Sequence, residues 1–320
     1  MRLFAFLLAF LVAFPLSAAP RARTEGGASA KERPTTTCGG DQSYDALKVT
    51  GFYAYPPFSW AEYDKTHYEK TGQKNYTYHG FVVEPLMQAI KDMGVKRLDQ
   101  MGFPAFEDAL KAGKRGQTDI VFTTYYQDDT QSGLDYIYPA YFGNPFVVVS
   151  RADKKLKISD TSQLSGMKGV IRVEEGIEPI IRGTLPTDTK IMLVNGPEEA
   201  FRALLSGEAD FMISSPYAAA AEARRFKVWK DVYIGEEPIK SVKIFAAFSK
   251  ISRCRKFKDL FAESFSALTA DKAAAEARMQ RAIDEWANMH RDDPPLEYVK
   301  PQAAAPEASA APAPVPPGQP

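Results

Sequence analysis

Few of the residue types that usually carry catalysis or bind metals occur in this sequence. It has three histidines, His67, His79 and His290, and two cysteines, Cys38 and Cys254. Four metal ligands would have to converge from these scattered residues, so we expect no histidine- or cysteine-built metal centre. Aromatic residues are plentiful instead, with 20 Phe, 15 Tyr and 3 Trp. Aromatic side chains with carboxylates nearby suit flat or cationic small molecules, through stacking and cation–π contacts.

One group of polar residues could support acid–base chemistry. His67, His79 and Glu84 lie within one stretch of the sequence, and histidine and carboxylate side chains are common proton donors and acceptors. The segment around them is rich in lysine and tyrosine, which favours an exposed polar loop over residues 64–78. We therefore expect that the protein is not an enzyme, and catalysis is the less favoured interpretation.

The charge balance excludes one broad class of function. Lys and Arg together number 40, Asp and Glu also number 40, and the formal net charge is zero. This balance argues against a nucleic-acid binder that works through a broad basic surface. The hydrophobic fraction of 45% and the charged fraction of 25% are typical of a soluble globular protein. A chain of 320 residues can hold one large or two ordinary domains.

Both ends of the sequence differ from its middle. Residues 1–19 begin with Arg2, continue with an apolar run over residues 3–14 and end in small residues, which predicts a secretory signal peptide and a periplasmic location. Residues 20–43 are polar, and we expect a flexible extension. The last twenty residues contain seven Pro and seven Ala, so we expect residues 294–320 to form a disordered tail.

Export would expose the two cysteines to an oxidising compartment. If Cys38 and Cys254 pair, they close a very long loop and tie the N-terminal extension to the fold. The alternative is two unpaired thiols. We favour the disulfide, because free thiols are disfavoured outside the cell.

Between the two ends, short apolar runs alternate with segments of helical periodicity. This alternation predicts an α/β architecture with mostly parallel sheets, in two modules with a cleft between them, where small-molecule sites are common. The expected strands cover residues 47–55, 119–123, 146–150, 169–173, 190–194, 210–213 and 242–248. The expected helices cover residues 83–93, 105–112, 178–183, 197–205, 216–225, 257–268 and 272–286.

Six short motifs follow one another in a recognisable order. They are the sequence AYPPFSW at residues 54–60, GFVVE at 80–84, a helix followed by Asp119 and a strand, DYIYP at 135–139, LSG at 164–166 and GEAD at 207–210. Together they resemble the periplasmic solute-binding proteins of ABC importers, specifically the family-3 group typified by polar amino-acid receptors.

The resemblance implies a two-lobed, type II periplasmic binding protein fold. Each lobe would be a mostly parallel sheet flanked by helices, with two hinge crossings between the lobes. Residues 44–143 and 241–293 would form lobe 1, and residues 144–240 would form lobe 2. Ligand binding would close the lobes around a small-molecule solute. The resemblance also implies a monomer without a cofactor that delivers its solute to a membrane ABC permease.

The resemblance places the ligand site on residues of both lobes. These are the aromatic residues of the first lobe, an acidic residue, and the positions that match the family's polar anchors: Tyr55, Phe58, Trp60, Glu84, Tyr125, Tyr126, Gln127, Thr130, Gly176, Ile177 and Ser215. Any one of the tyrosines could equally be lobe packing. Glu174 and Glu175 could reach the cleft or face solvent, and we favour solvent.

Four of these positions depart from the amino-acid receptors. Gln127 and Thr130 stand where the family has Thr and the Arg that clamps the ligand carboxylate. Ile177 replaces a Thr, and Ser215 replaces the acidic residue that binds the ligand ammonium. Loss of a buried charged anchor weakens binding on the order of a thousandfold. The sequence therefore argues against a conventional α-amino acid as the ligand.

Two non-catalytic roles fit this reading. The first is an exported solute-binding protein that serves an ABC permease. The second is a periplasmic sensor or accessory protein that uses the same fold to signal to a membrane partner, with the Pro/Ala tail as a tether. Genes for a permease and an ATPase nearby would favour the first role, and a kinase or cyclase gene would favour the second.

Overall fold

The computed structural model describes residues 38, 46–71, 74–95, 97–126 and 133–301. The signal peptide, most of the N-terminal extension, and residues 302–320 of the expected tail lie outside these residues, so the structure does not test them.

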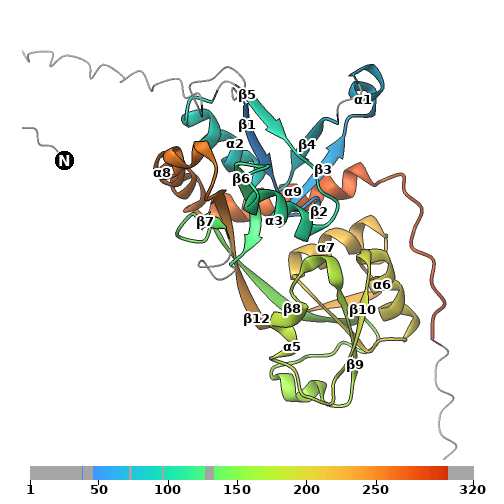
Figure 1. Ribbon diagram of the computed structural model, residues 1–320. Coiled ribbons are helices and arrows are strands. Elements are labelled where there is room, and N and C mark those ends of the chain that lie inside the picture. Colours follow the sequence, from blue (N-terminus) through green and yellow to red (C-terminus); the bar gives the residue numbers. More distant parts are fainter. Residues whose placement is uncertain (1–37, 39–45, 72–73, 96, 127–132, 302–320) are drawn as a thin grey trace, which may run out of the picture. The chain divides into compact units, whose positions relative to one another are not determined.

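One mixed sheet runs through the described part of the chain (Figure 1). Its strands in spatial order are β10 (Lys190–Val194), β9 (Lys168–Arg172), β11 (Phe211–Ser214), β8 (Phe142–Arg151), β12 (Val232–Ser249), β6 (Ile120–Tyr125), β1 (Ala46–Thr50) and β5 (Arg97–Gln100), with β7 (Leu134–Tyr136) also paired to β12.

The two ends of this sheet are parallel and its middle is antiparallel. β9 pairs in parallel with β10 and β11, and β1 pairs in parallel with β5 and β6. β8 and β12 run side by side as a long antiparallel ribbon between the two ends (Figure 1). The expected lobe boundaries fall within this ribbon, where Gly143 faces Lys243 and Asn144 faces Val242.

Helices accompany both ends of the sheet, and their apolar residues are buried. α2 carries Leu86 and Ile90 one turn apart, and both are buried in the core, as the helical spacing predicts. The helices are α2 (Val83–Asp92), α3 (Phe106–Lys114), α5 (Glu178–Arg182), α6 (Gly196–Ser206), α7 (Pro216–Arg225), α8 (Lys258–Thr269) and α9 (Lys272–Met289). The short 3-10 turns are η2 (Thr161–Leu164), η3 (Val173–Glu175) and η4 (Arg253–Phe257).

The expectation of a loop over residues 64–78 is wrong. The segment contains helix α1 (Lys65–Thr71) and strand β4 (Tyr76–His79), which joins β2 (Ala54–Tyr55) and β3 (Ser59–Tyr63) in a small antiparallel sheet. The many tyrosines made this segment look like a polar surface. Their rings instead pack on one another, with the Tyr63 centroid 5.8 Å from Tyr68 and 5.6 Å from Tyr76.

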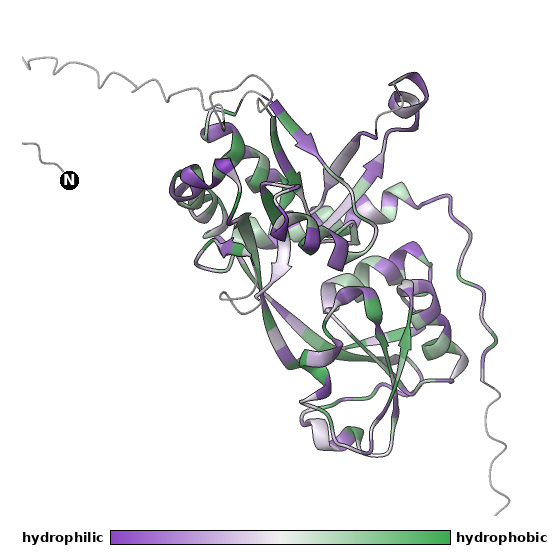
Figure 2. Ribbon diagram, in the orientation of Figure 1, coloured by the Kyte–Doolittle hydropathy of each residue, from purple (hydrophilic) through white to green (hydrophobic). Residues whose placement is uncertain are grey.

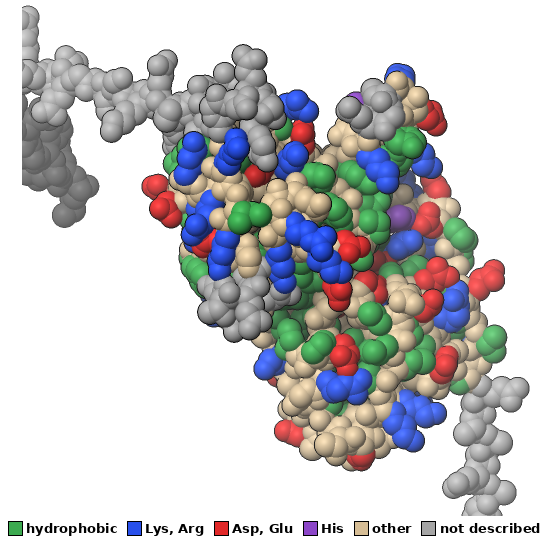
Figure 3. All heavy atoms as spheres, viewed as in Figure 1, with side chains coloured by type: hydrophobic (Ala, Val, Ile, Leu, Met, Phe, Trp, Pro, Cys, Tyr) green, Lys and Arg blue, Asp and Glu red, His purple; other side chains and the backbone are tan. Residues whose placement is uncertain are grey.

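The hydrophobic residues gather along the strands of the sheet (Figure 2). The larger core is rich in aromatic side chains, and Phe52, Phe122 and Phe248 are among its fully buried members. A smaller core lies under α6 and α7 and includes Phe201 and Met212. On the face shown in Figure 3, Lys and Arg side chains are interspersed with Asp and Glu, in keeping with the zero net charge.

Residues 294–301 do not fit the expectation of a disordered tail. Leu296 is buried in the smaller core, and its backbone N–H donates to the Phe226 carbonyl at 3.1 Å. Pro301 lies against Gly207 at the end of α6. Leu296, the partly buried Tyr298, a hydrogen bond from Arg202 to the Glu297 carbonyl and an ion pair between Lys300 and Asp231 together hold this segment on the fold.

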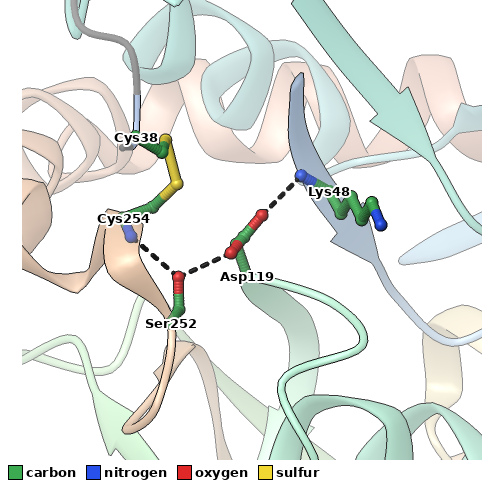
Figure 4. Close-up of a disulfide and its surroundings, with 5 residues drawn as sticks. All are labelled: Cys38, Lys48, Asp119, Ser252 and Cys254. Atoms are coloured by element: carbon green, nitrogen blue, oxygen red, sulfur yellow. Dashed lines mark hydrogen bonds between the residues drawn. A yellow bond between two sulfur atoms is a disulfide. The ribbon is translucent and has the colours of Figure 1, made fainter. Parts of the chain in front are cut away.

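A disulfide joins Cys38 to Cys254, which are 216 positions apart in sequence and have 4.7 Å between their Cα atoms (Figure 4). Hydrogen bonds surround it: the Cys254 N–H donates to Ser252 Oγ at 2.9 Å, and Ser252 Oγ donates to Asp119 Oδ1 at 2.5 Å. The second Asp119 oxygen accepts from the Lys48 N–H at 2.8 Å. This network fixes the start of β1 and β6 beside the C-terminal helices.

Within the described ranges, no helix is both long enough and apolar enough to cross a membrane. The same residues contain no group of three or more His, Cys, Asp or Glu side chains that could hold a metal ion.

Candidate functional site

Two expected site residues from the first half of the chain meet through their hydroxyl groups. Tyr55 ends β2 and Tyr125 ends β6, and Tyr125 donates a hydrogen bond to the Tyr55 oxygen at 3.2 Å. Asn144, at the start of the β8–β12 ribbon, donates from Nδ2 to the same Tyr55 oxygen at 2.9 Å. All three side chains are buried. Residues at the ends of three separate strands thus form one hydrogen-bonded cluster, the polar point of the site, inside an aromatic environment.

Aromatic rings surround this polar point. The Tyr55 ring lies 4.9 Å from both Phe52 and Phe58, and Phe52 stacks on Phe106 at 4.9 Å with an interplanar angle of 15°. Phe58 also contacts Tyr217 of α7 at 6.2 Å. These contacts place Tyr55 and Phe58 where elements from both ends of the sheet meet.

A buried ion pair lies directly after β9. Arg172 and Glu175 are only 4% and 1% exposed. Arg172 donates to Glu175 Oε1 from Nε at 2.6 Å and also from Nη2. The expectation that Glu175 faces solvent is therefore wrong, whereas Glu174 is partly exposed and lies 3.6 Å from Arg172 Nη1. The turn that follows has a left-handed residue at Gly176, as its φ of 64° shows, and a Cβ at this position would lie 3.4 Å from the Phe106 ring.

The ion pair and the tyrosines are close enough to influence each other electrostatically. Burial raises the pKa of the Tyr55 and Tyr125 hydroxyls, and the Glu175 carboxylate raises both further. Burial also raises the pKa of Glu175, against the opposing effect of the Arg172 guanidinium. Burial works to lower the pKa of Arg172, but the neighbouring carboxylates outweigh it and raise the value, so Arg172 stays charged.

Several buried polar atoms of this region have no hydrogen-bond partner among the described residues. They are Asn144 Oδ1, Arg172 Nη1, Glu175 Oε2 and Ser215 Oγ. A buried polar atom left without a partner costs about 1–3 kcal/mol, and more when it is charged. Atoms of this kind indicate a place where water or a ligand supplies the missing bonds.

The remaining expected residues of the second lobe lie on buried turns. Ile177 is fully buried and precedes α5, and Ser215 is fully buried and precedes α7. Ser215 directly follows β11, Ile177 follows β9 after a short turn, and Arg172 is the last residue of β9. The two residues are therefore held by the same edge of the sheet that holds the ion pair.

The structure does not bring every expected residue to this site. Trp60 stacks on His79 at 5.8 Å and meets Trp286 at 5.3 Å, in a different aromatic group. Glu84 is exposed and pairs with Arg281 at 3.1 Å. The partners Trp286 and Arg281 both belong to α9. Tyr126 is also outside the site, and Gln127 and Thr130 lie outside the described residues.

Tyr126 lies in different surroundings from Tyr125, its neighbour in sequence. Its side chain is 50% exposed and contacts Tyr136 at 5.2 Å and Phe245 at 6.2 Å. Successive residues of a strand point to opposite faces. Tyr125 therefore points into the polar centre while Tyr126 points away from it.

The alternative acid–base set is not assembled in the structure. His79 lies between Glu62, at 3.5 Å, and Glu285, at 3.0 Å. Glu84 belongs to the separate pair with Arg281, and His67 lies on α1. His79 and Glu84 therefore pair with different residues rather than with each other.

A cavity of about 630 Å³ opens between the start of β8 and helices α7 and α9. Phe142, Tyr217, Met279 and Ile283 are among its walls. None of the unpartnered polar atoms lines it. It is a mainly apolar space, and its lining residues differ from those of the tyrosine group.

Sequence reasoning missed Asn144 and Arg172 and misjudged Glu175. Arg172 ends an apolar strand and is followed by two acidic residues and a glycine, in the order Arg-Val-Glu-Glu-Gly. Charged residues three positions apart around a turn can pair, and this spacing was the available signal. Nothing in the sequence around Asn144 distinguishes it from an ordinary strand residue.

No protein-family model matches the sequence, and no curated protein matches it. Solved structures match in fold. One is an amino acid ABC transporter substrate-binding protein, AbpA from Streptococcus pneumoniae, bound to L-arginine. It superposes with a TM-score of 0.60 and 14% sequence identity, over 77% of this chain and 97% of that one.

Two further structures of the same fold come from different kinds of protein. The ancestral amino acid-binding protein AncCDT-1, a precursor of cyclohexadienyl dehydratase, matches with a TM-score of 0.56 and 20% identity, over 76% of this chain and 96% of that one. A histidine kinase sensor domain with similarity to periplasmic binding proteins matches with a TM-score of 0.55 and 16% identity, over 75% of this chain and 95% of that one. The chain thus has the two-lobed α/β fold of the periplasmic binding proteins, as the sequence motifs predicted.

Proposed function

We propose that this protein is an exported, periplasmic solute-binding protein. It captures a small molecule between lobe 1, residues 44–143 and 241–293, and lobe 2, residues 144–240, and delivers it as a monomer to a membrane ABC permease. The fold supports this role, because solved structures of the same fold include amino acid ABC transporter substrate-binding proteins. The apolar N-terminal run supports export.

The observation that carries the proposal is the set of unpartnered buried polar atoms around Tyr55 and Tyr125. Asn144 Oδ1, Glu175 Oε2 and Ser215 Oγ come from three elements and have no protein partner among the described residues. Most buried polar groups of folded proteins have a partner. A solute with matching hydrogen-bonding groups would pair them when it binds.

The solute is not a conventional α-amino acid. Such a ligand needs a cation for its carboxylate and an anion for its ammonium. In this chain the two corresponding positions hold Thr130 and Ser215, which carry no charge. The buried Arg172 already donates two hydrogen bonds to Glu175, so it does not serve as a ready substitute clamp.

Native mass spectrometry of the mature protein, purified from the periplasm of a bacterial host, tests the proposal. We expect a bound mass that mild denaturation releases, because a solute that pairs buried groups dissociates slowly. If no mass is bound, a thermal-shift screen of small molecules follows, since a ligand at a hundred times its dissociation constant stabilises by about 2.7 kcal/mol. Absence of both a retained mass and any stabilising compound would contradict a solute-binding role.

A sensing role is the second candidate, because a histidine kinase sensor domain shares the fold. It would use the same captured solute but signal to a membrane partner instead of a permease. The genes beside this one separate the two: permease and ATPase genes support transport, and a kinase or cyclase gene supports sensing.

A further inference from the structure

The chemistry of the unpartnered atoms restricts the class of solute. Two of them, Glu175 Oε2 and Asn144 Oδ1, are oxygens that accept hydrogen bonds and cannot donate them. The Tyr55 oxygen already accepts from Tyr125 and from Asn144. A solute that completes this site must therefore present N–H or O–H donors toward these acceptors.

The donors of Arg172 are less available than these acceptors. Its Nε and Nη2 are both directed at Glu175 Oε1, and its Nη1 lies 3.6 Å from Glu174 Oε1. An anionic solute would have to separate a buried ion pair to reach the guanidinium. Breaking such a pair is strongly unfavourable, because it leaves an uncompensated buried charge.

The charges around the site favour a positive solute. Arg172 pairs with two carboxylates, Glu174 and Glu175, and in a separate group Arg225 pairs with two more, Glu222 and Asp293. Glu222 is buried on α7 and interacts electrostatically with Arg172 as well as with Arg225. The carboxylates outnumber the guanidiniums, so an added anion would be repelled and an added cation attracted.

The aromatic side chains around the site also favour a cationic solute. Tyr55 and Tyr125 are buried beside the stacked rings of Phe52 and Phe106. The faces of aromatic rings attract cations and stack on flat groups. Gly176 holds the turn that bears Glu175 against the Phe106 ring, so the carboxylate and the aromatic wall belong to one site.

We infer, on the basis of the proposed solute-binding function, that the solute is a small organic cation with N–H donors and a flat or aromatic part. Glu175 Oε2 accepts from its positively charged nitrogen, and Arg172 holds Glu175 in place through Oε1. Asn144 Oδ1 accepts a second hydrogen bond. Glu175, on the turn after β9, thus anchors the solute. No charged side chain is then needed at the positions of Thr130 and Ser215.

A matched set of probes tests this inference on the mature protein after any retained solute has been washed out. 2-Phenylethylamine and benzamidine are aromatic cations, 3-phenylpropionate is an anion and 2-phenylethanol is neutral. Titration calorimetry should show that at least one cation binds ten times or more tightly than the anion and the neutral probe. Equal or tighter binding of 3-phenylpropionate would overturn the inference.

Variants then locate the anchor. Glu175→Gln should weaken cation binding at least tenfold, whereas the matched control Glu178→Gln, three residues away and paired with Arg182 in α5, should change it less than threefold. If Glu175→Gln does not fold, the double variant Arg172→Gln/Glu175→Gln replaces both partners of the pair, and it should lose the preference for cations over 2-phenylethanol. Retention of that preference in a folded variant would overturn the assignment of Glu175.

The outcome separates this inference from the proposed function. If native mass spectrometry releases a retained solute but neither cation binds, the protein binds solutes and the inferred class is wrong. If no solute is retained and no compound stabilises the protein, the proposed function itself fails.

Discussion

Two polar networks in this protein differ in how completely their atoms are paired. Beside the disulfide, both oxygens of Asp119 accept hydrogen bonds, from the Lys48 N–H and from Ser252, and Ser252 in turn accepts from the Cys254 N–H. Around Tyr55, by contrast, one oxygen of Glu175 and the amide oxygen of Asn144 have no partner among the described residues.

The difference separates a stabilising network from a binding network. A fully paired network holds elements together and leaves nothing for a ligand to complete. A partly paired network keeps an energetic cost in the empty protein that a ligand can remove. The account therefore predicts that changes beside the disulfide lower stability alone, and that changes around Tyr55 lower solute affinity more than stability.

The largest expected effect is loss of the disulfide. Replacing both Cys38 and Cys254 with Ala should lower the free energy of unfolding by about 2–5 kcal/mol, because the bridge spans a very long loop. Urea unfolding of the variant and of the reduced native protein should agree with each other. Solute affinity should stay unchanged where the variant is folded. A variant as stable as the native protein would show that the bridge does not hold the fold.

The next effect comes from Asp119. Asp119→Ala removes the acceptor for the Lys48 N–H and for Ser252, and should cost about 2 kcal/mol of stability. Asp119→Asn keeps one oxygen acceptor and should cost less. Thermal unfolding of both variants measures the difference. A loss of solute affinity at a temperature where the variants are folded would contradict the separation between the two networks.

Tyr55→Phe tests the other network with a smaller stability effect. The change removes the oxygen that accepts from Tyr125 and Asn144, and should cost about 1 kcal/mol of stability. It should weaken solute binding about tenfold, since Asn144 and Tyr125 lose their orientation. Tyr141→Phe is the matched control: the Tyr141 hydroxyl bonds Thr123 at 3.4 Å, outside the tyrosine pair. Equal affinity losses in both variants would contradict a special role for Tyr55.

The smallest effect depends on pH. Burial works to raise the pKa of Asp135, but hydrogen bonds from Lys258 and Arg255 outweigh it and lower the value below its ordinary 3.8. A lowered pKa stabilises the fold above the ordinary value, and this stabilisation is lost as the pH falls through the lower one. Asp135→Asn weakens these hydrogen bonds and should therefore cost about 1 kcal/mol at pH 7.

The pH profile of unfolding provides the check. The stability difference between the native protein and Asp135→Asn should shrink as the pH falls below about 4. Asp259→Asn, a change at an exposed carboxylate in the first turn of α8, controls for the change in net charge. A gap between native protein and Asp135→Asn that persists at pH 2 would contradict the ionic origin of the effect.

Much of the fold could be predicted, because apolar spacing decides local structure. The expected helix over residues 83–93 is α2, since Leu86 and Ile90 must share one buried face. The expected strand over residues 190–194 coincides with β10. The segment 64–78 could not be predicted in this way, because its tyrosines pack on one another while partly exposed and leave no apolar periodicity.

Only the aromatic residues of the site could be predicted from the sequence. Tyr55 and Tyr125 follow strand ends, where the fold places side chains at the edge of a sheet. Glu175 looked like a solvated charge, and its burial depends on Arg172 three residues earlier and on the Phe106 ring from another helix. Asn144 gains its role from its contact with Tyr55, which is 89 residues away in sequence.

A crystal structure of the protein purified with its natural solute tests the central claim most directly. The account predicts a small molecule whose donor atoms lie within hydrogen-bond distance of Glu175 Oε2 and Asn144 Oδ1, with its flat part beside the surrounding rings. A solute bound instead in the apolar cavity between β8, α7 and α9, with Glu175 and Asn144 bonded only to protein or water, would contradict it.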